Sequence, residues 1–210
     1  MTFKATSYGV ICKISNKILC IQRQNSIACV DILMGNFKTY KSLRELAYNL
    51  TPEELFILQT QGISTLQVTF QAKIPKRIRN SFVIISNILK NINHQELCFE
   101  KTEILLPKGR PKKNENNVLA AKREFFEETG CFIPFLNYKF KSTEKYFGPE
   151  NIILYENVYF HGKLNKFNPN FHCREVSKVY LYSYKEFYDK IDPRRIELKY
   201  LIFNLNKNNF

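Results

Sequence analysis

The sequence predicts a mixed α/β protein that carries a mainly helical insertion. Three features support this prediction: a strand hairpin near the N-terminus, a helical stretch after it, and alternating strand-like and helical runs from about residue 99 onward. The chain has 210 residues, of which 44% are hydrophobic and 24% charged, as is typical of a folded protein. We expect a core formed by residues 1–36 and 96–210, with residues 37–95 inserted between its two parts.

The first elements follow from local composition. Residues 6–24 contain two runs rich in Ile, Val and Cys, separated by the turn-forming pair Ser15-Asn16, and therefore predict two paired strands. From about residue 39 to 93 the apolar residues adopt helical spacing, and Thr51-Pro52-Glu53-Glu54 is typical of a helix start. The inserted segment is therefore predicted to be mainly helical.

A second set of strands and helices is predicted after the insertion. Residues 116–129 contain no Gly or Pro and precede Gly130, which predicts a helix with a glycine C-cap. Strands are predicted at 99–106, where Pro107-Lys108-Gly109 begins a loop, and at about 142–147, 152–161 and 175–183, and a final helix is predicted from Pro193 to about Asn206.

Charge, cysteine content and hydropathy indicate which partners and which cellular location to expect. Thirty-two Lys and Arg against nineteen Asp and Glu give a formal net charge of +13, which favours polyanionic partners. The six Cys stand singly, without metal-ligand spacing, and predict reduced thiols. The first residues lack the basic and apolar regions typical of a signal peptide, and no stretch of this sequence approaches roughly 18 apolar residues. We therefore expect a soluble cytoplasmic protein with no membrane partner and no DNA partner.

The predicted helix at 116–129 carries an unusual group of acids. Glu124, Glu127 and Glu128 are spaced i, i+3 and i+4, so they point to one side of the helix. Each like-charge pair at this spacing costs about 0.2–0.5 kcal/mol, which indicates a cation between them. Because neither Cys nor His is nearby, a hard divalent ion with oxygen ligands, Mg²⁺ or Mn²⁺, suits the site.

Apolar residues fill the other sides of this helix and are expected to hold it by packing, namely Val118, Leu119, Phe125 and Phe126. Taken alone, a Glu-x-x-Glu-Glu string is more often a solvated helix face than a site. The residues around this string favour a functional site instead.

Residues 109–131 resemble, at every specified position, the Nudix box G-x5-E-x7-R-E-U-x-E-E-x-G-U, in which U is apolar. Cys131 replaces an aliphatic residue at the last position and keeps its apolar character. The resemblance implies a Nudix α/β/α sandwich with a mixed sheet. It also implies a metal-dependent pyrophosphohydrolase that acts on a nucleoside diphosphate linked to another group.

The resemblance also implies roles for single residues. Glu124, Glu127 and Glu128 become metal ligands, together with the main-chain carbonyl of Lys108, while Arg123 orients the acids. Families that share the box differ on the catalytic base, so Glu128 and Glu124 both stay candidates. The first acid of the box, Glu115, is expected to be structural.

Enzymes with this box usually recruit a further carboxylate from outside it. The candidates are Glu144, Glu150, Glu156 and Glu175. We favour Glu175 because Arg174-Glu175-Val176-Ser177-Lys178 resembles the segment before the late strand of decapping Nudix proteins, where this Glu contributes to metal binding or base catalysis. The alternative is a surface Glu paired with a neighbouring cation.

Over most of its length the chain resembles the viral mRNA-decapping Nudix enzymes of large cytoplasmic DNA viruses, most closely the African swine fever virus type and more distantly those of poxviruses. The similar places are the hairpin at 8–23 with the insertion after it, the box with its flanks at 106–112 and 123–130, and the later segments 142–147 and 175–178. The resemblance implies capped mRNA as substrate. Hydrolysis of the cap triphosphate bridge would release 7-methyl-GDP and leave 5′-monophosphate RNA in the host cytoplasm, which would cause host mRNA degradation and shutoff.

Charge in the insertion agrees with an RNA substrate. Residues 36–95 hold eight Lys and Arg against three Glu. A cluster of four is predicted to bind RNA phosphates: Lys73, Lys76, Arg77 and Arg79. Such a cluster can also be a solvated face, and diphosphoinositol polyphosphates or nucleoside polyphosphates are alternative substrates. Cap stacking would require an aromatic side chain, for which Tyr8, Tyr146, Phe147 and Phe171 are candidates.

Overall fold

The computed structural model describes residues 3–70, 73–97, 101–147, 153–170, 173–192 and 195–207. The chain forms two units, one from residues 1–23 and 104–210 and the other from residues 24–103. We call them the sheet unit and the helical unit and describe each by itself.

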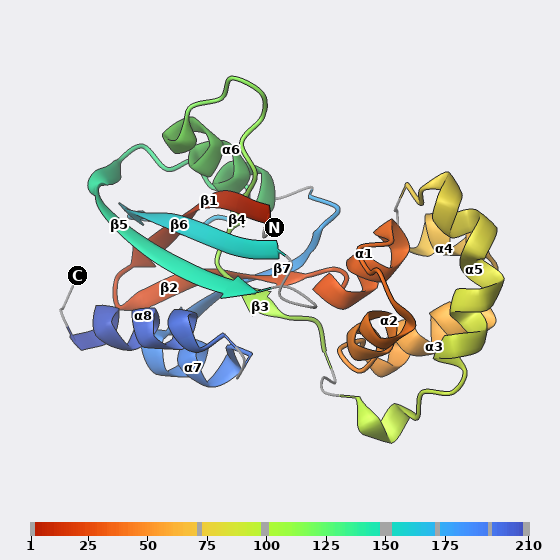
Figure 1. Ribbon diagram of the computed structural model, residues 1–210. Helices are drawn as coiled ribbons and strands as arrows, with labels where there is room; N and C mark the ends of the chain where they lie inside the picture. The colour runs from red at the N-terminus through yellow and green to blue at the C-terminus, as the bar shows by residue number, and fades with distance from the viewer. Residues whose placement is uncertain are drawn as a thin grey trace. The chain divides into compact units, whose positions relative to one another are not determined.

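The helical unit is built from short helices around its own apolar core (Figure 1). Its elements are α1 (Ile27–Met34), α2 (Tyr40–Ala47), α3 (Pro52–Thr60), α4 (Ile63–Thr69), α5 (Lys76–Leu89) and the 3-10 helix η1 (His94–Glu96). Thr51 caps α3 through a reciprocal capping box with Glu54, as the Thr-Pro-Glu-Glu pattern predicts.

The helical unit is larger than the predicted insertion of residues 37–95. It begins at residue 24 because α1 buries Cys29, Ile32 and Leu33 in the core of this unit. The predicted core boundary at residue 36 therefore assigned α1 to the wrong unit.

The sheet unit holds a mixed sheet in the order β3-β2-β1-β6-β5, with β4 paired to β1 and β7 to β2. Its strands are β1 (Phe3–Ile14), β2 (Lys17–Arg23), β3 (Ile104–Leu105), β4 (Lys108–Gly109), β5 (Leu136–Phe147), β6 (Ile153–Lys163) and β7 (Val176–Ser183). Strands β1 and β6 are parallel over their whole paired length, while the other pairs are antiparallel.

Helices cover both faces of this sheet (Figure 1). Helix α6 (Asn117–Thr129) lies over one face, and α7 (Tyr184–Lys190) and α8 (Ile196–Lys207) lie over the other. One apolar cluster joins Phe125 of α6 to Val10 and Phe160, and a second joins α7 and α8 to Ile11 and Tyr159. The predicted mixed α/β/α sandwich is confirmed.

The limits of α6 agree with the prediction to within one residue. The side chain of Asn116 accepts a hydrogen bond from the Val118 N–H at 2.8 Å, and Gly130 ends the helix at φ +68°. Its packing was predicted only in part. Phe125 is fully buried, but Leu119 and Phe126 are 60% and 53% exposed, because the sheet covers one side of the helix.

Two other predictions changed. Lys108–Gly109 forms strand β4 against Tyr8–Gly9 instead of starting a loop, and β3 begins at Ile104, while Phe99 lies outside the described residues. Helix α7 was not predicted; it begins with a capping box in which the Ser183 hydroxyl accepts from the Glu186 N–H.

The cysteines of the described residues are free thiols. Cys12, Cys20, Cys29 and Cys131 are buried, and Cys173 is half-buried, whereas Cys98 lies outside the described residues. Across the described ranges, no helix has both the length and the apolar content that a membrane crossing requires.

The burial difference between neighbouring Phe residues gives a test of this packing. We expect Phe125→Ala to lower the free energy of unfolding by about 3–5 kcal/mol, because it leaves a cavity between α6 and the sheet. Phe126→Ala, on the exposed side, is the matched control and should cost less than about 1 kcal/mol. Urea unfolding monitored by circular dichroism measures both, and equal losses would contradict the packing described.

Candidate active site

The side chain of Arg123 joins the acids of α6 to the loop before it. Its Nε and Nη2 atoms donate to the two carboxylate oxygens of Glu115 at 2.8 and 2.9 Å. Its Nη1 atom donates to Glu124 at 2.6 Å and to Glu127 at 3.0 Å. One guanidinium therefore offsets part of the repulsion expected among these carboxylates.

Glu115 fixes the loop to the helix. It accepts a further hydrogen bond from the Lys112 N–H at 2.7 Å, and Nη2 of Arg123 also donates to the Arg110 carbonyl at 3.0 Å. The hydrogen bonds from Arg123 hold the pKa of Glu115 well below its usual range. Glu115 thus stays charged at neutral pH and anchors the loop, in keeping with the structural role expected for it.

Glu128 occupies a different environment from the other acids of α6. It is only 5% exposed, and its Oε2 atom accepts a hydrogen bond from the backbone N–H of Lys108 at 2.8 Å. Burial raises the pKa of Glu128, while the nearby charges of Lys108 and Arg23 act in the opposite direction. Burial, and then the positive charge of Arg195, lower the pKa of the Lys108 ammonium.

Gly109 lets strand β4 approach α6 closely. A Cβ atom at this position would lie 2.1 Å from Cδ of Glu124, so a larger residue would displace that carboxylate. Burial raises the pKa of Glu124, and the negative charges of Glu127 and Glu175 raise it further. The sheet unit therefore brings the charges of Glu124, Glu127, Glu128 and Glu175 close together.

Comparison with known proteins agrees with this geometry. The Nudix domain family matches residues 91–203, more than half of the chain. The chain belongs to the Nudix family. It is accordingly a hydrolase of the pyrophosphohydrolase type, and Nudix hydrolases generally use divalent metal ions.

Solved structures share the fold at low identity. The Ap4A hydrolase of C. elegans in a binary complex has a TM-score of 0.52 and 12% identity, over 98% of each chain. The MutT protein of Methanosarcina mazei Go1 has a TM-score of 0.52 and 8% identity, over 99% of this chain and 96% of that one. No curated protein matches the sequence.

The described candidates for an additional Nudix carboxylate lie in different environments. Glu144 is fully buried and bound by Arg195, by Asn157 at 2.9 Å and by Tyr159 at 3.3 Å, so its oxygens are engaged in structure. Glu156 pairs with Lys4 at 2.7 Å. Glu175 precedes β7, and its charge acts on Glu124.

Glu150, the remaining candidate, lies outside the described residues, as does the candidate cap-stacking residue Phe171.

The carboxylates of the Nudix box suit a hard divalent cation by their chemistry. Among the described residues, no three His, Cys, Asp or Glu side chains are arranged as a metal-binding group. Arg123 holds Glu124 and Glu127, while Glu128 accepts from Lys108. Burial raises the pKa of both Glu124 and Glu128, because it disfavours their charged forms. A bound cation would stabilise those charged forms, so these carboxylates fit a divalent ion.

Sequence reasoning missed two cations near Glu128 and Lys108. Arg23 ends β2, and its charge lowers the pKa of Glu128, while Arg195 precedes α8, and its charge lowers the pKa of Lys108. No motif marks Arg23 or Arg195, because these residues come near the box only through contacts between segments distant in the chain.

The predicted RNA-binding cluster lies in the helical unit. Lys76, Arg77 and Arg79 belong to the first turn of α5, Lys73 precedes it, and all four are exposed. Arg77 also donates to the Gly35 carbonyl at 3.0 Å, at the C-terminal end of α1. Arg77 therefore has a structural contact, which distinguishes it from the other three.

The burial of Glu128 leads to a pH-dependent prediction. Its raised pKa means that the folded protein binds a proton more tightly than the unfolded chain, so stability falls as pH rises from about 4.3 towards the folded pKa. Without metal, we expect Glu128→Gln to be more stable than wild type at pH 8, by about 1–3 kcal/mol, and equally stable near pH 4.

Thermal unfolding at both pH values, with and without Mg²⁺ or Mn²⁺, measures this effect. Added metal should raise the melting temperature of the wild type more than that of the variant, since binding stabilises only the folded state. A variant that is no more stable at pH 8 would show that Glu128 ionises without a penalty. An equal response to metal would exclude Glu128 as a ligand.

Proposed function

We propose that this Nudix hydrolase decaps mRNA. It would cleave the cap triphosphate bridge, release 7-methyl-GDP and leave 5′-monophosphate RNA in the cytoplasm of a cell infected by a large DNA virus. The observation that carries the proposal is the combination of an intact Nudix box with a separate helical unit that presents exposed cations.

The N-terminal end of α5 favours binding of phosphate groups. This 14-residue helix has no acidic residue in its first turn and no side-chain hydrogen bond at its N-cap, Pro75. Lys76 and Arg79 therefore add positive charge to the positive end of the helix dipole, which costs stability unless an anion is bound there. Among the described residues, Lys73, Lys76 and Arg79 form no ion pair.

The site residues supply distinct parts of the chemistry. A buried carboxylate with a raised pKa suits a general base near neutral pH, which supports Glu128, with Glu124 as the second candidate. Arg123 orients Glu124 and Glu127, and Glu175 adds negative charge beside them. A divalent ion bound to Glu124, Glu127, Glu128, Glu175 and the Lys108 carbonyl would neutralise phosphate charge and lower the pKa of an attacking water.

A second candidate function is hydrolysis of nucleoside polyphosphates. The Ap4A hydrolase whose fold this chain shares supports it, since a dinucleoside polyphosphate also contains linked phosphates. Diphosphoinositol polyphosphates belong to the same class of dense polyanions and would need the same metal and base.

Capped RNA labelled in the cap phosphates distinguishes these functions. With Mn²⁺ or Mg²⁺ we expect release of 7-methyl-GDP, and we expect Glu128→Gln to lower the rate by at least about 100-fold, because it removes the base or a metal ligand. Chromatography of the products measures both. Turnover of Ap4A or a diphosphoinositol polyphosphate without release from capped RNA would reject decapping and keep the Nudix chemistry.

The cation cluster of α5 gives an independent test. We expect Lys73→Gln/Lys76→Gln/Arg79→Gln to weaken RNA binding about tenfold or more and to leave Ap4A hydrolysis unchanged, because an RNA strand offers the cluster many more phosphates than Ap4A does. The control Lys38→Gln/Lys41→Gln/Lys90→Gln removes the same charge from other exposed positions of the helical unit. Fluorescence anisotropy with uncapped RNA measures binding, and equal effects of the two triple variants would reject a specific cluster.

A further inference from the structure

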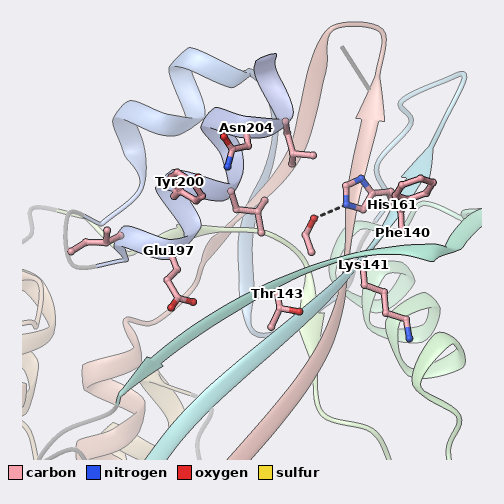
Figure 2. Close-up of a pocket in the computed structure, with 11 residues that line it drawn as sticks. Phe140, Lys141, Thr143, His161, Glu197, Tyr200 and Asn204 are labelled. Carbon is pink, nitrogen blue, oxygen red and sulfur yellow. Dashed lines mark hydrogen bonds between the residues drawn. The ribbon is translucent and has the colours of Figure 1, made fainter. Parts of the chain in front are cut away.

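A groove crosses the face of the sheet opposite the one that α6 covers. It consists of two hollows, of about 650 and 260 Å³, that share His161 and Leu205 in their walls. The larger one lies between α8 and strands β5 and β6 (Figure 2). Because α6 packs against the other face of the sheet, this groove is separate from the acids of the box.

Two lysines of like charge lie side by side in the smaller hollow, on neighbouring strands of the sheet. Lys13 of β1 and Lys163 of β6 are direct partners in the parallel register, and both line this hollow. Like charges directly opposite on neighbouring strands destabilise a sheet. Within the described ranges neither lysine forms an ion pair, so an anion bound between them would remove the repulsion.

The larger hollow carries exposed aromatic rings. Tyr200 of α8 is 68% exposed and Phe140 of β5 is 54% exposed, and both line it. The acid in its wall, Glu197, accepts a hydrogen bond from the Lys145 N–H. The ammonium of Lys141 lies over the ring of Phe160, on the face that α6 covers, so the positive charge of the groove comes from the smaller hollow.

A polar pair lies where the two hollows meet. A hydrogen bond of 2.8 Å joins the Ser142 hydroxyl and Nε2 of His161 (Figure 2). His161 lines both hollows. Burial lowers the pKa of His161, so at neutral pH the imidazole is uncharged. The groove thus presents, in order, a cationic end, a neutral hydrogen-bonding centre and an aromatic end.

We propose that this groove binds a segment of single-stranded RNA. A backbone phosphate lies between Lys13 and Lys163, and a neighbouring base stacks on Tyr200 or Phe140, the combination of cations and aromatic rings that single strands require. The choice of RNA as the strand rests on the proposed decapping function. Binding of uncapped RNA is measured without hydrolysis, so failure of the groove and failure of decapping are separate results.

Two variants test the two ends of the groove. With a fluorescent 12-nucleotide RNA, we expect Tyr200→Ala to weaken binding at least about fivefold, through loss of one stacked base. We expect Lys13→Gln/Lys163→Gln to weaken binding about tenfold and to lower the slope of log Kd against log salt by about 0.7, since the two lysines bind one phosphate and one phosphate contact to a single strand accounts for about 0.7.

Matched controls come from the same protein. Phe203→Ala removes an exposed aromatic ring from α8 that does not line the hollows, and Lys101→Gln/Lys185→Gln removes equal charge elsewhere. Both should bind RNA as the wild type does, and thermal unfolding confirms that every variant is folded. RNA containing 4-thiouridine should crosslink to the peptide that holds Tyr200.

Wild-type affinity in both groove variants would overturn the proposal. A mononucleotide that binds as tightly as the 12-nucleotide strand, and loses affinity in the same variants, would reject an RNA strand and assign the groove to a free nucleotide.

Discussion

The hydrogen bonds of Arg123 are the interaction on which the rest of the site depends. Glu115 of the preceding loop would repel Glu124 and Glu127 of α6, and one planar guanidinium binds all three. The same side chain attaches the loop at Arg110 to the helix. A Lys at this position would offer a single charged group without the fork geometry, so the identity of this residue sets the positions of the acids.

Glu128 shows how one helix can hold carboxylates with different properties. Arg123 binds two acids of α6, but Glu128 turns toward β4, where burial raises its pKa and the Lys108 N–H is its hydrogen-bond donor. Gly109 supports this arrangement, because a Cβ atom at its position would displace the carboxylate of Glu124 beside β4. The short strand β4 is therefore part of the site as well as of the sheet.

The alternation of side chains along β1 connects the box to the proposed RNA groove. Val10 and Cys12 face α6 and support it, while Ile11 and Lys13 face the side of α7 and α8. The two functional surfaces of the sheet unit thus share one strand without sharing a cavity. The helical unit has its own core and contributes a third charged surface at the start of α5.

The sequence by itself determined the elements and residues whose signals are local. The limits of α6 and the hairpin of β1 and β2 follow from periodicity and turn residues within about twenty positions. The spacing of Arg123 with Glu124, Glu127 and Glu128 is read directly from the sequence. Only the tertiary structure decided that Glu128 is buried while Leu119 is exposed, that α1 belongs to the helical unit, and that Lys13 faces Lys163. These properties depend on segments far apart in the chain, because burial and electrostatic environment arise from packing and strand pairing rather than from local sequence.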